Sequence, residues 1–374
     1  MSEARRMLDL AARLALRGAG LVEPNPMVGA VLVRDGRVIG LGHHTRFGAL
    51  HAEREAIADC RRRGGDPRGA TLYCTLEPCK HTGKQPPCVD AIVEAGVGRV
   101  VFARRDPCVE SGGGGERLRE AGIAAELCEE SELAVGVSDP FIKRVTTGMP
   151  WVIAKWAQTI DGRVATRTGE SQWISSPASR RRVHRLRARV DAVLTGSGTV
   201  LADDPTLNAR EARRVRRVAK RVVLDTDLDV PLESTLVRTA GELPTVLACS
   251  KDLITAGITE TKRLALERAG VTILGVPEEN GRLHLDLLLR AMSEKLGVTN
   301  VLVEAGPGLL GSLFERDLVD EAVVYVAPMM LGDEHARSVA SWRAAESLDA
   351  ALRLALWRVK RVGNDVELTY RRRA

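Results

Sequence analysis

The sequence predicts an α/β protein with two domains, and three observations support this prediction. Strand-like and helix-like segments alternate along the chain, which is typical of sheets covered by helices. The length of 374 residues exceeds that of a usual single domain. Residues 146–150 carry the glycine and proline that are common at a domain boundary. We therefore expect one domain over residues 1–148 and a second over residues 149–374.

The composition excludes several classes of protein. Hydrophobic residues make up 44% and charged residues 28%, which are near globular averages and argue against disorder. No segment approaches the roughly 18 unbroken apolar residues of a membrane span, so we expect no membrane partner. The net charge of +6 is compatible with anionic ligands without requiring nucleic acid. Seven cysteines, an odd number in a long chain, favour a reducing cytoplasm over a secreted disulfide scaffold.

The first elements of the N-terminal domain are a helix and a hairpin. Residues 1–20 are expected to form a surface helix rather than a signal peptide, because apolar residues recur at helical spacing. This apolar face consists of Leu8, Ala11, Ala12, Ala15 and Leu16. Two strand-like runs then flank Asp35-Gly36, a dipeptide typical of tight hairpin turns. We therefore expect residues 27–41 to begin a sheet.

The rest of this domain continues the alternation. A helix is expected over 51–65, a strand over 70–78, a helix over 89–96 and a strand over 97–103. The run Ser-Gly-Gly-Gly-Gly at 111–115 is expected to be a flexible insertion, because glycine permits many backbone conformations. These elements together predict a layered α/β domain.

The C-terminal domain is predicted to contain a mostly parallel, doubly wound sheet. Its strand-like runs cover 151–159, 191–195, 221–225, 245–249, 271–275, 300–304 and 321–327. Helix-like segments lie between most of these runs, as connections between parallel strands require. The clearest helix covers 283–296, where one apolar face is formed by Leu285, Leu288, Leu289, Met292 and Leu296.

Three residues of the N-terminal domain form a candidate zinc site. His51 begins the first helix after the hairpin, Cys79 ends the following strand and Cys88 begins the next helix. Three such ligands leave a fourth position open, where zinc lowers the pKa of a bound water. Glu53 is placed to move protons between that water and a leaving amine. The alternative is a pair of core cysteines beside a surface histidine.

The order of these residues matches a known chemical pattern. Zinc-dependent nucleobase deaminases carry H-x-E followed by P-C-x-x-C. This chain has His51-Ala52-Glu53 followed by Pro78-Cys79, and departs only in having eight residues between the two cysteines. Zinc-dependent deamination is therefore the chemistry that the pattern favours.

A glycine-rich turn in the C-terminal domain predicts a dinucleotide site. Residues 306–311 read Gly-x-Gly-x-x-Gly between the strand 300–304 and an apolar helix pattern. Backbone N–H groups of such a turn approach a pyrophosphate at the helix N-terminus, although an ordinary strand-to-helix turn is the alternative. The acidic residue that binds an unphosphorylated ribose about 20 positions further on is absent, because that position is Val326. NADP therefore suits the sequence better than NAD.

Two arginine clusters precede this turn. They comprise Arg180, Arg181, Arg182, Arg185, Arg187 and Arg189, and then Arg210, Arg213, Arg214, Arg216, Arg217, Lys220 and Arg221. Guanidinium groups bind phosphates bidentately, so one or two are expected to hold a substrate phosphate or the 2′-phosphate of the cofactor. Most are expected on the solvated surface. Residues 180–221 contain no aromatic residues to stack on bases, which disfavours nucleic acid.

Three stretches of the N-terminal domain resemble motifs of the bifunctional riboflavin-biosynthesis deaminase/reductase family. They are 24–33 (PNPMVGAVLV), 42–53 (GHHTRFGALHAE) and 75–88 (TLEPCKHTGKQPPC). The resemblance implies a cytidine-deaminase-like domain in which Glu53 is catalytic and one zinc ion is bound by His51, Cys79 and Cys88. It also implies that Asn25, His44 and His81 line the pyrimidine pocket. The chain departs from the family pattern at Lys80, where serine is usual, and at 106–115, which replaces a loop with Asp-Pro-Asn-Pro.

The resemblance continues through the second half and covers nearly the whole chain. Residues 154–175 and 195–210 resemble motifs of the family's reductase domain, which implies a dihydrofolate-reductase-like fold. The implied NADPH-binding residues are Ala157, Trp173, Thr199, Asp203, Thr226, Gly306, Pro307, Gly308, Leu309, Leu310, Gly311 and Ser312. The implied substrate-binding residues are Ser171, Arg187, Leu207, Arg210 and Glu304. Lys155 and Asp161 match positions near the nicotinamide end, while Thr159-Ile160 replaces the usual Ser-Leu.

The resemblance implies a cytoplasmic enzyme with two activities. Zinc-dependent hydrolytic deamination of a diaminopyrimidinone that carries a phosphoribosylamino group is followed by NADPH-dependent reduction of the ribosyl side chain. A small-molecule substrate and a homodimer or larger homo-oligomer are also implied. Two alternatives stay open: an RNA-editing deaminase whose basic C-terminal half binds RNA in a salt-dependent manner, and an enzyme in which one half is only a scaffold.

Overall fold

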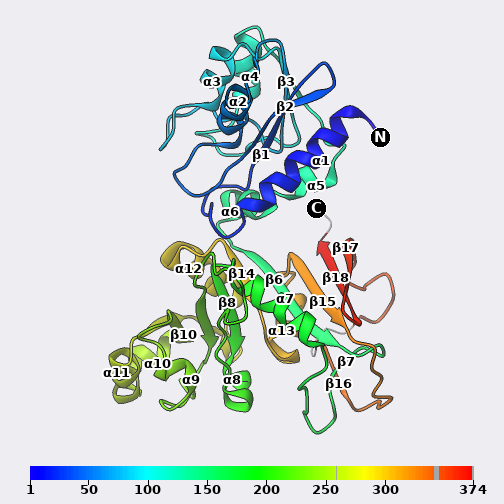
Figure 1. Ribbon diagram of the computed structural model, residues 1–374. Helices are drawn as coiled ribbons and strands as arrows, with labels where there is room; N and C mark the ends of the chain where they lie inside the picture. Colours follow the sequence, from blue (N-terminus) through cyan, green and yellow to red (C-terminus); the bar gives the residue numbers. More distant parts are fainter. Residues whose placement is uncertain (258, 341–344, 373–374) are drawn as a thin grey trace. The chain divides into compact units, whose positions relative to one another are not determined.

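The computed structural model describes residues 1–257, 259–340 and 345–372. Contacts within the chain separate two compact units, Met1–Met149 and Pro150–Ala374 (Figure 1). None of the helices in the described ranges is long and apolar enough to cross a membrane.

The first unit contains a five-stranded mixed sheet with the order β2-β1-β3-β4-β5. Its strands are β1 (Gly29–Arg34), β2 (Arg37–His43), β3 (Thr71–Cys74), β4 (Arg99–Phe102) and β5 (Ala124–Leu127). β1 pairs antiparallel with β2 and β3, whereas β3, β4 and β5 are parallel. Asp35 and Gly36 have φ angles of 50° and 70°, the left-handed backbone that a tight hairpin turn needs, which confirms the predicted hairpin.

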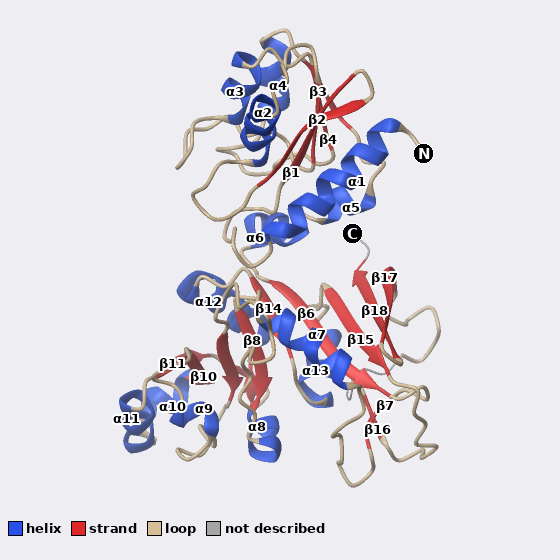
Figure 2. Cartoon of the chain, viewed as in Figure 1, coloured by secondary structure: helices blue, strands red, loops and turns tan. Residues whose placement is uncertain are grey.

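Helices cover both faces of this sheet (Figure 2). They are α1 (Glu3–Ala15), α2 (Ala52–Arg62), α3 (Cys88–Glu94), α4 (Gly114–Glu120), α5 (Glu132–Gly136) and α6 (Asp139–Thr147). Because side chains alternate along a strand, Leu32 and Leu72 pack with α2, α3 and α4, while Val31 and Tyr73 pack with α1 and α5. Leu16 does not join the predicted apolar face of α1 and is 44% exposed, because the chain tightens into a 3₁₀ turn there.

The glycine-rich segment 111–115 is packed, so the expected flexible insertion is wrong. Gly114 and Gly115 are buried and begin α4. A Cβ atom at Gly114 would lie 1.8 Å from the carbonyl oxygen of Pro78, so no larger residue fits there. The N–H of Gly115 donates to Oε1 of Glu77 at 2.9 Å, and Oε2 of Glu77 accepts from the N–H of Asp106 at 3.1 Å. The buried Glu77 thus ties the end of this segment at Gly115, and Asp106 before the segment, to the residues that follow β3.

We expect Gly114→Ala to lower the free energy of unfolding of the first unit by about 2–3 kcal/mol, because overpacking of this size forces the backbone to move. Chemical denaturation monitored by circular dichroism measures the change. Gly241→Ala is the control, because an added Cβ there meets no described atom within 4 Å, and it should be neutral or slightly stabilising. Equal, small effects of both changes would contradict the packing of segment 111–115.

The second unit contains a nine-stranded sheet with the order β11-β10-β9-β8-β14-β6-β15-β18-β17. Its strands are β6 (Trp151–Gln158), β8 (Ala192–Gly196), β9 (Lys220–Leu224), β10 (Thr245–Ser250), β11 (Val271–Val276), β14 (Asn300–Val303), β15 (Glu321–Val326), β17 (Leu354–Val362) and β18 (Asp365–Arg372). The first seven strands in this spatial order, from β11 at one edge to β15, are parallel to one another. This arrangement confirms the seven predicted strands and the mostly parallel sheet. The antiparallel hairpin β17–β18 was not predicted.

The helices of the second unit are α7 (Pro177–Arg187), α8 (Ser197–Asp203), α9 (Thr235–Arg238), α10 (Lys251–Ala256), α11 (Glu260–Arg268), α12 (Leu285–Leu296) and α13 (Pro307–Glu315). Two small antiparallel sheets pair β7 (Arg163–Ala165) with β16 (Arg337–Ser338) and β12 (Glu278–Glu279) with β13 (Arg282–Leu283). Four residues of the predicted apolar face of α12 are buried, namely Leu285, Leu288, Leu289 and Met292, whereas Leu296 at the end of the helix is only partly buried. The carboxyl ends of the parallel strands meet at one edge of the sheet, where ligands of such sheets bind.

Candidate functional site

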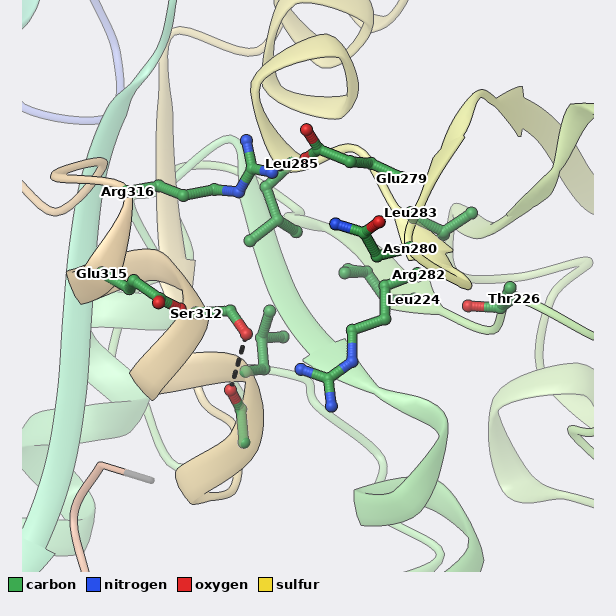
Figure 3. Close-up of a pocket in the computed structure, with 12 residues that line it drawn as sticks. Leu224, Thr226, Glu279, Asn280, Arg282, Leu283, Leu285, Ser312, Glu315 and Arg316 are labelled. Carbon is green, nitrogen blue, oxygen red and sulfur yellow. Dashed lines mark hydrogen bonds and ion pairs between the residues drawn. The ribbon is translucent and has the colours of Figure 1, made fainter. Parts of the chain in front are cut away.

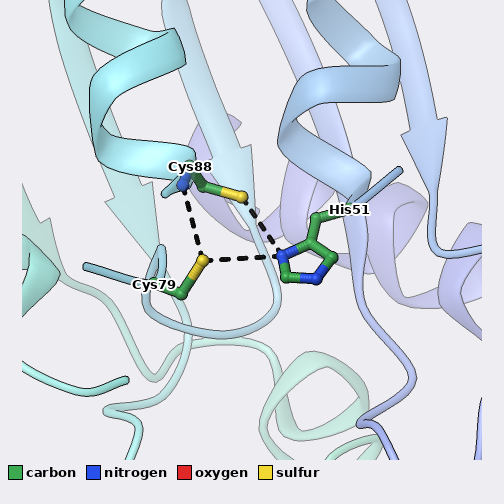
Figure 4. A group of neighbouring side chains, drawn as sticks. All are labelled: His51, Cys79 and Cys88. Carbon is green, nitrogen blue, oxygen red and sulfur yellow. Dashed lines mark hydrogen bonds between the residues drawn. The ribbon is translucent and has the colours of Figure 1, made fainter. Parts of the chain in front are cut away.

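One histidine and two cysteines of the first unit lie close together (Figure 4). His51 caps the N-terminus of α2, Cys79 lies in the loop after β3 and Cys88 begins α3. Nδ1 of His51 is 3.5 Å from Sγ of Cys79 and 3.4 Å from Sγ of Cys88. Zinc bonds of about 2.3 Å to sulfur and about 2.0 Å to nitrogen give tetrahedral ligand separations of about 3.5 Å. The donor set and its spacing therefore fit a zinc ion with three protein ligands.

The electrostatics of this group favour metal binding. Hydrogen bonds from Cys88 and His51 lower the pKa of Cys79 to about 4, despite the burial of the thiol. The N–H of Cys88, at the start of α3, also lies 3.4 Å from Sγ of Cys79. A thiolate is the form of cysteine that binds metal ions, so Cys79 is prepared for that role.

Glu53 lies in the first turn of α2 and is almost completely buried. Burial, together with the charge of Cys79, raises the pKa of Glu53 to about 7. A nearby cation lowers this pKa and favours the carboxylate, so the group can accept a proton at neutral pH and give it up again. The carboxyl group of Glu53, its burial and its pKa of about 7 therefore all suit a proton shuttle.

Two of the three predicted pyrimidine-pocket residues lie beside the metal group. The rings of His44 and His51 meet edge to face with centroids 5.4 Å apart, and Nδ2 of Asn25 is 3.4 Å from Nε2 of His44. Nδ1 of His44 is 3.0 Å from the carbonyl oxygen of Leu50. Because a carbonyl oxygen only accepts, Nδ1 carries the proton and Nε2 is an acceptor. The buried Nδ1 of His81 has no hydrogen-bond partner within the described part of the chain.

The two departures from the family pattern contact each other. The N–H of Lys80 donates to the carbonyl oxygen of Ser111 at 3.1 Å, and Arg117 donates to the carbonyl oxygen of Lys80 at 3.1 Å. The ammonium of Lys80 lies next to Gly113. Lys80 and the altered segment 106–115 are thus parts of one local arrangement, which begins directly after the predicted metal ligand Cys79.

A pocket of about 590 Å³ in the second unit lies between the end of β9 and the start of α13 (Figure 3). Four predicted cofactor residues line it: Thr226, Gly308, Leu309 and Ser312. Gly306 is the N-cap residue of α13, and no side chain of the described residues caps this helix, so the N–H groups of Gly308 and Leu309 in its first turn can bind an anion. Leu310 and Gly311 lie on the buried face of α13.

The other predicted cofactor residues do not line this pocket. The ring of Trp173 is 62% exposed and stacks under the guanidinium of Arg180 at 4.5 Å. Asp203 accepts a hydrogen bond from the side chain of Gln172 at 3.1 Å. Ala157 lies in β6 and Thr199 in α8, and both are partly buried. The structure thus groups Thr226 with the glycine turn and places these four residues elsewhere.

A second cavity, of about 200 Å³, groups three of the predicted substrate residues, Arg187, Leu207 and Arg210. Arg187 binds Glu304 through two hydrogen bonds of 2.5 and 3.0 Å, and Nζ of Lys155 is 3.2 Å from the same carboxylate. Burial alone would raise the pKa of Glu304, but Arg187 and Lys155 outweigh it and hold this pKa at about 2. The fifth predicted residue, Ser171, is exposed in the loop before α7.

Several arginines expected on the solvated surface are instead structural. Arg221 is 1% exposed, and its guanidinium donates to the carbonyl oxygens of Leu236 and Leu243 at 3.0 and 3.1 Å. Arg182 pairs with Glu367, which is fully buried, and Arg217 pairs with Asp191. These three arginines are therefore exceptions to the expectation that most residues of the two clusters lie on the solvated surface.

Asp161 and the hairpin β12–β13 complete the description of the second unit. The carboxylate of Asp161 accepts from the hydroxyl of Thr159 at 2.5 Å and from the N–H of Gly332 at 2.8 Å, so it ties two loops together. The hairpin β12–β13 lines the large pocket but was missed in the sequence. Its Asn280-Gly281 dipeptide is a tight-turn signal that could have revealed it.

Two family profiles match the chain. The profile described as RibD C-terminal domain matches residues 150–368, and the one described as cytidine and deoxycytidylate deaminase zinc-binding region matches residues 1–104. The chain is 37% identical to the riboflavin biosynthesis protein RibD of Aquifex aeolicus over 371 residues, which cover 98% of each chain. It is 39% identical to the protein of the same name from Escherichia coli over 369 residues, which cover 95% of this chain and 96% of the relative.

Comparison with solved structures shows the same similarity to riboflavin-biosynthesis deaminase/reductases as the sequence comparisons. The chain resembles RibD from Acinetobacter baumannii with a TM-score of 0.81 and 35% identity over 99% of both chains. It also resembles a diaminohydroxyphosphoribosylaminopyrimidine deaminase/5-amino-6-(5-phosphoribosylamino)uracil reductase from Thermotoga maritima, with a TM-score of 0.80 and 32% identity over 99% of both chains. Each likeness includes both units.

Proposed function

The chain belongs to the RibD family of riboflavin-biosynthesis deaminase/reductases, and from this premise we propose that it catalyses two successive reactions. The first is hydrolytic deamination of a diaminopyrimidinone that carries a phosphoribosylamino group. The second is NADPH-dependent reduction of the ribosyl side chain to a ribityl chain. The observation that carries the proposal is the group of His51, Cys79 and Cys88 beside the buried Glu53.

In the deamination step, His51, Cys79 and Cys88 would hold the metal, and Glu53 would move the protons. Zinc supplies a Lewis acid that lowers the pKa of water. Glu53 accepts a proton as water adds to the amino-bearing ring carbon, and it then protonates the amino nitrogen. The hydroxyl proton of the added water passes to the neighbouring ring nitrogen, the C–N bond breaks, ammonia leaves and a carbonyl group forms, so both protons of the water are accounted for. The burial of Glu53 keeps this proton out of exchange with bulk water.

The polar groups beside the metal would orient the pyrimidine ring. Nε2 of His44 is an acceptor, and the amide of Asn25 lies next to it, so a ring edge with alternating donors and acceptors can bind there. The buried Nδ1 of His81 is a third group able to receive such a contact. These assignments rest on the family resemblance together with the contacts given above.

In the reduction step, the residues of the second unit would bind the two reactants. NADPH supplies the hydride that reduces C1′ of the opened ribosyl imine. The N–H groups at the start of α13, after Gly306, would bind the cofactor pyrophosphate. Arg187 and Arg210 would bind the substrate phosphate, with Glu304 orienting Arg187.

A small molecule is favoured over RNA as the substrate. Arg182, Arg217 and Arg221 are engaged by Glu367, Asp191 and main-chain carbonyl groups, so they do not form a continuous basic surface. None of the seven cysteines, all of which lie in the described ranges, forms a disulfide bond, which supports a reducing compartment such as the cytoplasm. A homodimer or larger homo-oligomer is part of the proposal on the family resemblance alone.

A divided assay tests the proposed function. Purified protein is mixed with the phosphoribosylated diaminopyrimidinone, ammonia is measured without NADPH, and NADPH oxidation is followed after NADPH is added. We expect ammonia first and NADPH oxidation second. Chelation should abolish ammonia release and added zinc should restore it, because the donor set binds that metal. Ammonia without later NADPH oxidation would refute the reductase assignment, and NADPH oxidation without ammonia would refute the deaminase assignment.

Two cysteine variants separate metal loss from general damage in this assay. Cys79→Ser removes a predicted zinc ligand, whereas Cys128→Ser changes a partly buried thiol that packs near α1, away from the metal group. We expect Cys79→Ser to lose bound zinc by elemental analysis and ammonia release by at least about 100-fold. Cys128→Ser should keep both. Full zinc content in Cys79→Ser would contradict the metal site.

A further inference from the structure

Arg54 joins the two helices that begin at predicted metal ligands, and the family resemblance gives it no role. It lies in the first turn of α2, three residues after His51. Its Nε donates to the carbonyl oxygen of Pro86 at 3.2 Å, and its Nη2 donates to that of Pro87 at 2.8 Å. Pro87 directly precedes Cys88, the first residue of α3 (Figure 4). One guanidinium group thus connects the start of α2 to the start of α3.

The stability of α2 does not explain why an arginine stands at this position. The N-terminus of a helix carries a partial positive charge, which favours acidic residues in the first turn and disfavours a cation. Glu53 and Glu55 follow this preference, whereas Arg54 opposes it. The side chain of Arg54 is also only partly exposed, so it does not simply extend into solvent. The contacts with Pro86 and Pro87 therefore give the physical reason for an arginine here.

The loop 80–87, which connects the two predicted metal-binding cysteines, ends at these prolines. Pro86 and Pro87 have no N–H group, so their carbonyl oxygens are the main-chain groups through which this end of the loop can form hydrogen bonds. The side chain of Gln85 donates to the carbonyl oxygen of Gly48 at 3.1 Å, but that bond leads to the loop before α2 and not to the helix itself. The guanidinium group therefore ties the end of loop 80–87 directly to α2.

We propose that Arg54 is a positioning residue of the zinc site, which holds Cys88 at ligand distance from His51 before the metal binds. This inference rests on the proposed function, because it concerns the affinity of that site for its metal. Sγ of Cys88 and Nδ1 of His51 lie 3.4 Å apart, close to the separation of two zinc ligands. A loop that is already held in this arrangement loses less conformational entropy when the metal binds. Arg54 therefore raises the affinity for zinc without contacting the metal.

The charge of Arg54 would by itself have the opposite effect. A guanidinium on the same helical turn as a metal ligand repels a divalent cation. If only this charge mattered, replacement of Arg54 by alanine would tighten zinc binding. If the two hydrogen bonds to the loop matter, the same replacement weakens zinc binding. The direction of the change therefore distinguishes the two roles.

Competition with a chelator measures the zinc affinity of the full chain and tests this assignment. We expect Arg54→Ala to weaken zinc binding about 10- to 100-fold, the effect of replacing groups that orient metal ligands. Arg54→Lys should fall between, because an ammonium keeps the charge but lacks the fork that reaches both carbonyl groups. Arg61→Ala is the control, because it removes an exposed arginine from the last turn of the same helix. It should leave the zinc affinity unchanged, which excludes an effect of net charge.

Ammonia release at saturating zinc is a second, independent measurement. The loop is then fixed through its two cysteines, so Arg54→Ala should show a kcat and a KM for the diaminopyrimidinone close to those of the wild type. At limiting zinc, the same variant should release ammonia more slowly in proportion to its lower zinc content. NADPH oxidation with the deaminated intermediate should be normal at every zinc concentration, which excludes a general loss of folding.

The outcomes also separate this inference from the proposed function. Unchanged or tighter zinc binding by Arg54→Ala would overturn the inference and leave the deaminase assignment intact. A raised KM at saturating zinc would overturn it too, because Arg54 would then act on the substrate. If the alanine variant does not fold, the zinc affinity of Arg54→Lys decides in the same way. A wild-type protein that binds no zinc would overturn the metal site and this inference together.

Discussion

Glu53→Gln is expected to lower the rate of ammonia release by about 10³- to 10⁴-fold while reduction of the deaminated intermediate continues at its normal rate. Glutamine preserves the shape of the side chain but cannot carry the proton from water to the leaving amine, and proton transfer by a positioned group contributes effects of this order. The residue lies in the first unit, and the proposed cofactor and substrate residues of the reductase lie in the second. The two activities should therefore separate in one variant.

The separation is measured with both substrates supplied independently. Ammonia release is followed with the diaminopyrimidinone, and NADPH oxidation is followed with the deaminated intermediate. Glu55→Gln is the matched control, because Glu55 lies on the same turn of α2 but pairs with the exposed Arg62. It should retain both activities within about twofold. Loss of both activities in a folded, zinc-loaded Glu53→Gln protein would contradict two independent sites.

The grouping of His51, Cys79 and Cys88 could be predicted because each residue lies at the end of a regular element. His51 precedes α2, Cys79 follows β3 and Cys88 begins α3, and the alternation of strands and helices brings such ends to one edge of the sheet. The predicted strands were identifiable for a related reason. Apolar runs bounded by turn residues report burial on both faces, and that signal is local in the sequence.

Three of the incorrect or missing predictions have a common physical cause, since each of these features depends on partners that are distant in the sequence. The buried Arg221 is satisfied by Leu236 and Leu243, and no local pattern distinguishes it from a surface arginine. Gly114 is required by the carbonyl oxygen of Pro78, 36 positions earlier, rather than by a need for flexibility. The strand β18 alternates polar and apolar residues from Asp365 to Tyr370, but its buried side chains are the polar Asp365, Glu367 and Thr369, and pairing with β15 determines its place in the sheet.

Glu304→Gln is expected to have the largest effect on stability, lowering the free energy of unfolding of the second unit by about 3 kcal/mol at neutral pH. The carboxylate is largely buried and is held by Arg187 and Lys155, whose side chains are only 14% and 18% exposed. Removing it leaves two buried cations without their counter-charge, which costs more than the pair itself contributes. Glu260→Gln, which breaks an exposed pair with Arg263 on α11, is the control and should leave stability unchanged.

The pH dependence of this effect follows from the pKa of Glu304, which lies at about 2 in the folded chain, below the ordinary value of 4.5. As the pH falls below 4.5, the unfolded chain takes up the proton before the folded chain does, so the stability that this carboxylate contributes is present above pH 4.5 and is lost toward pH 2. Glutamine has no such proton, so the stability difference between wild type and Glu304→Gln should narrow steadily below pH 4.5. Denaturant unfolding between pH 7 and pH 3 measures the two curves. Parallel curves over that range would mean that the ionised carboxylate is not what holds Arg187 and Lys155 in place.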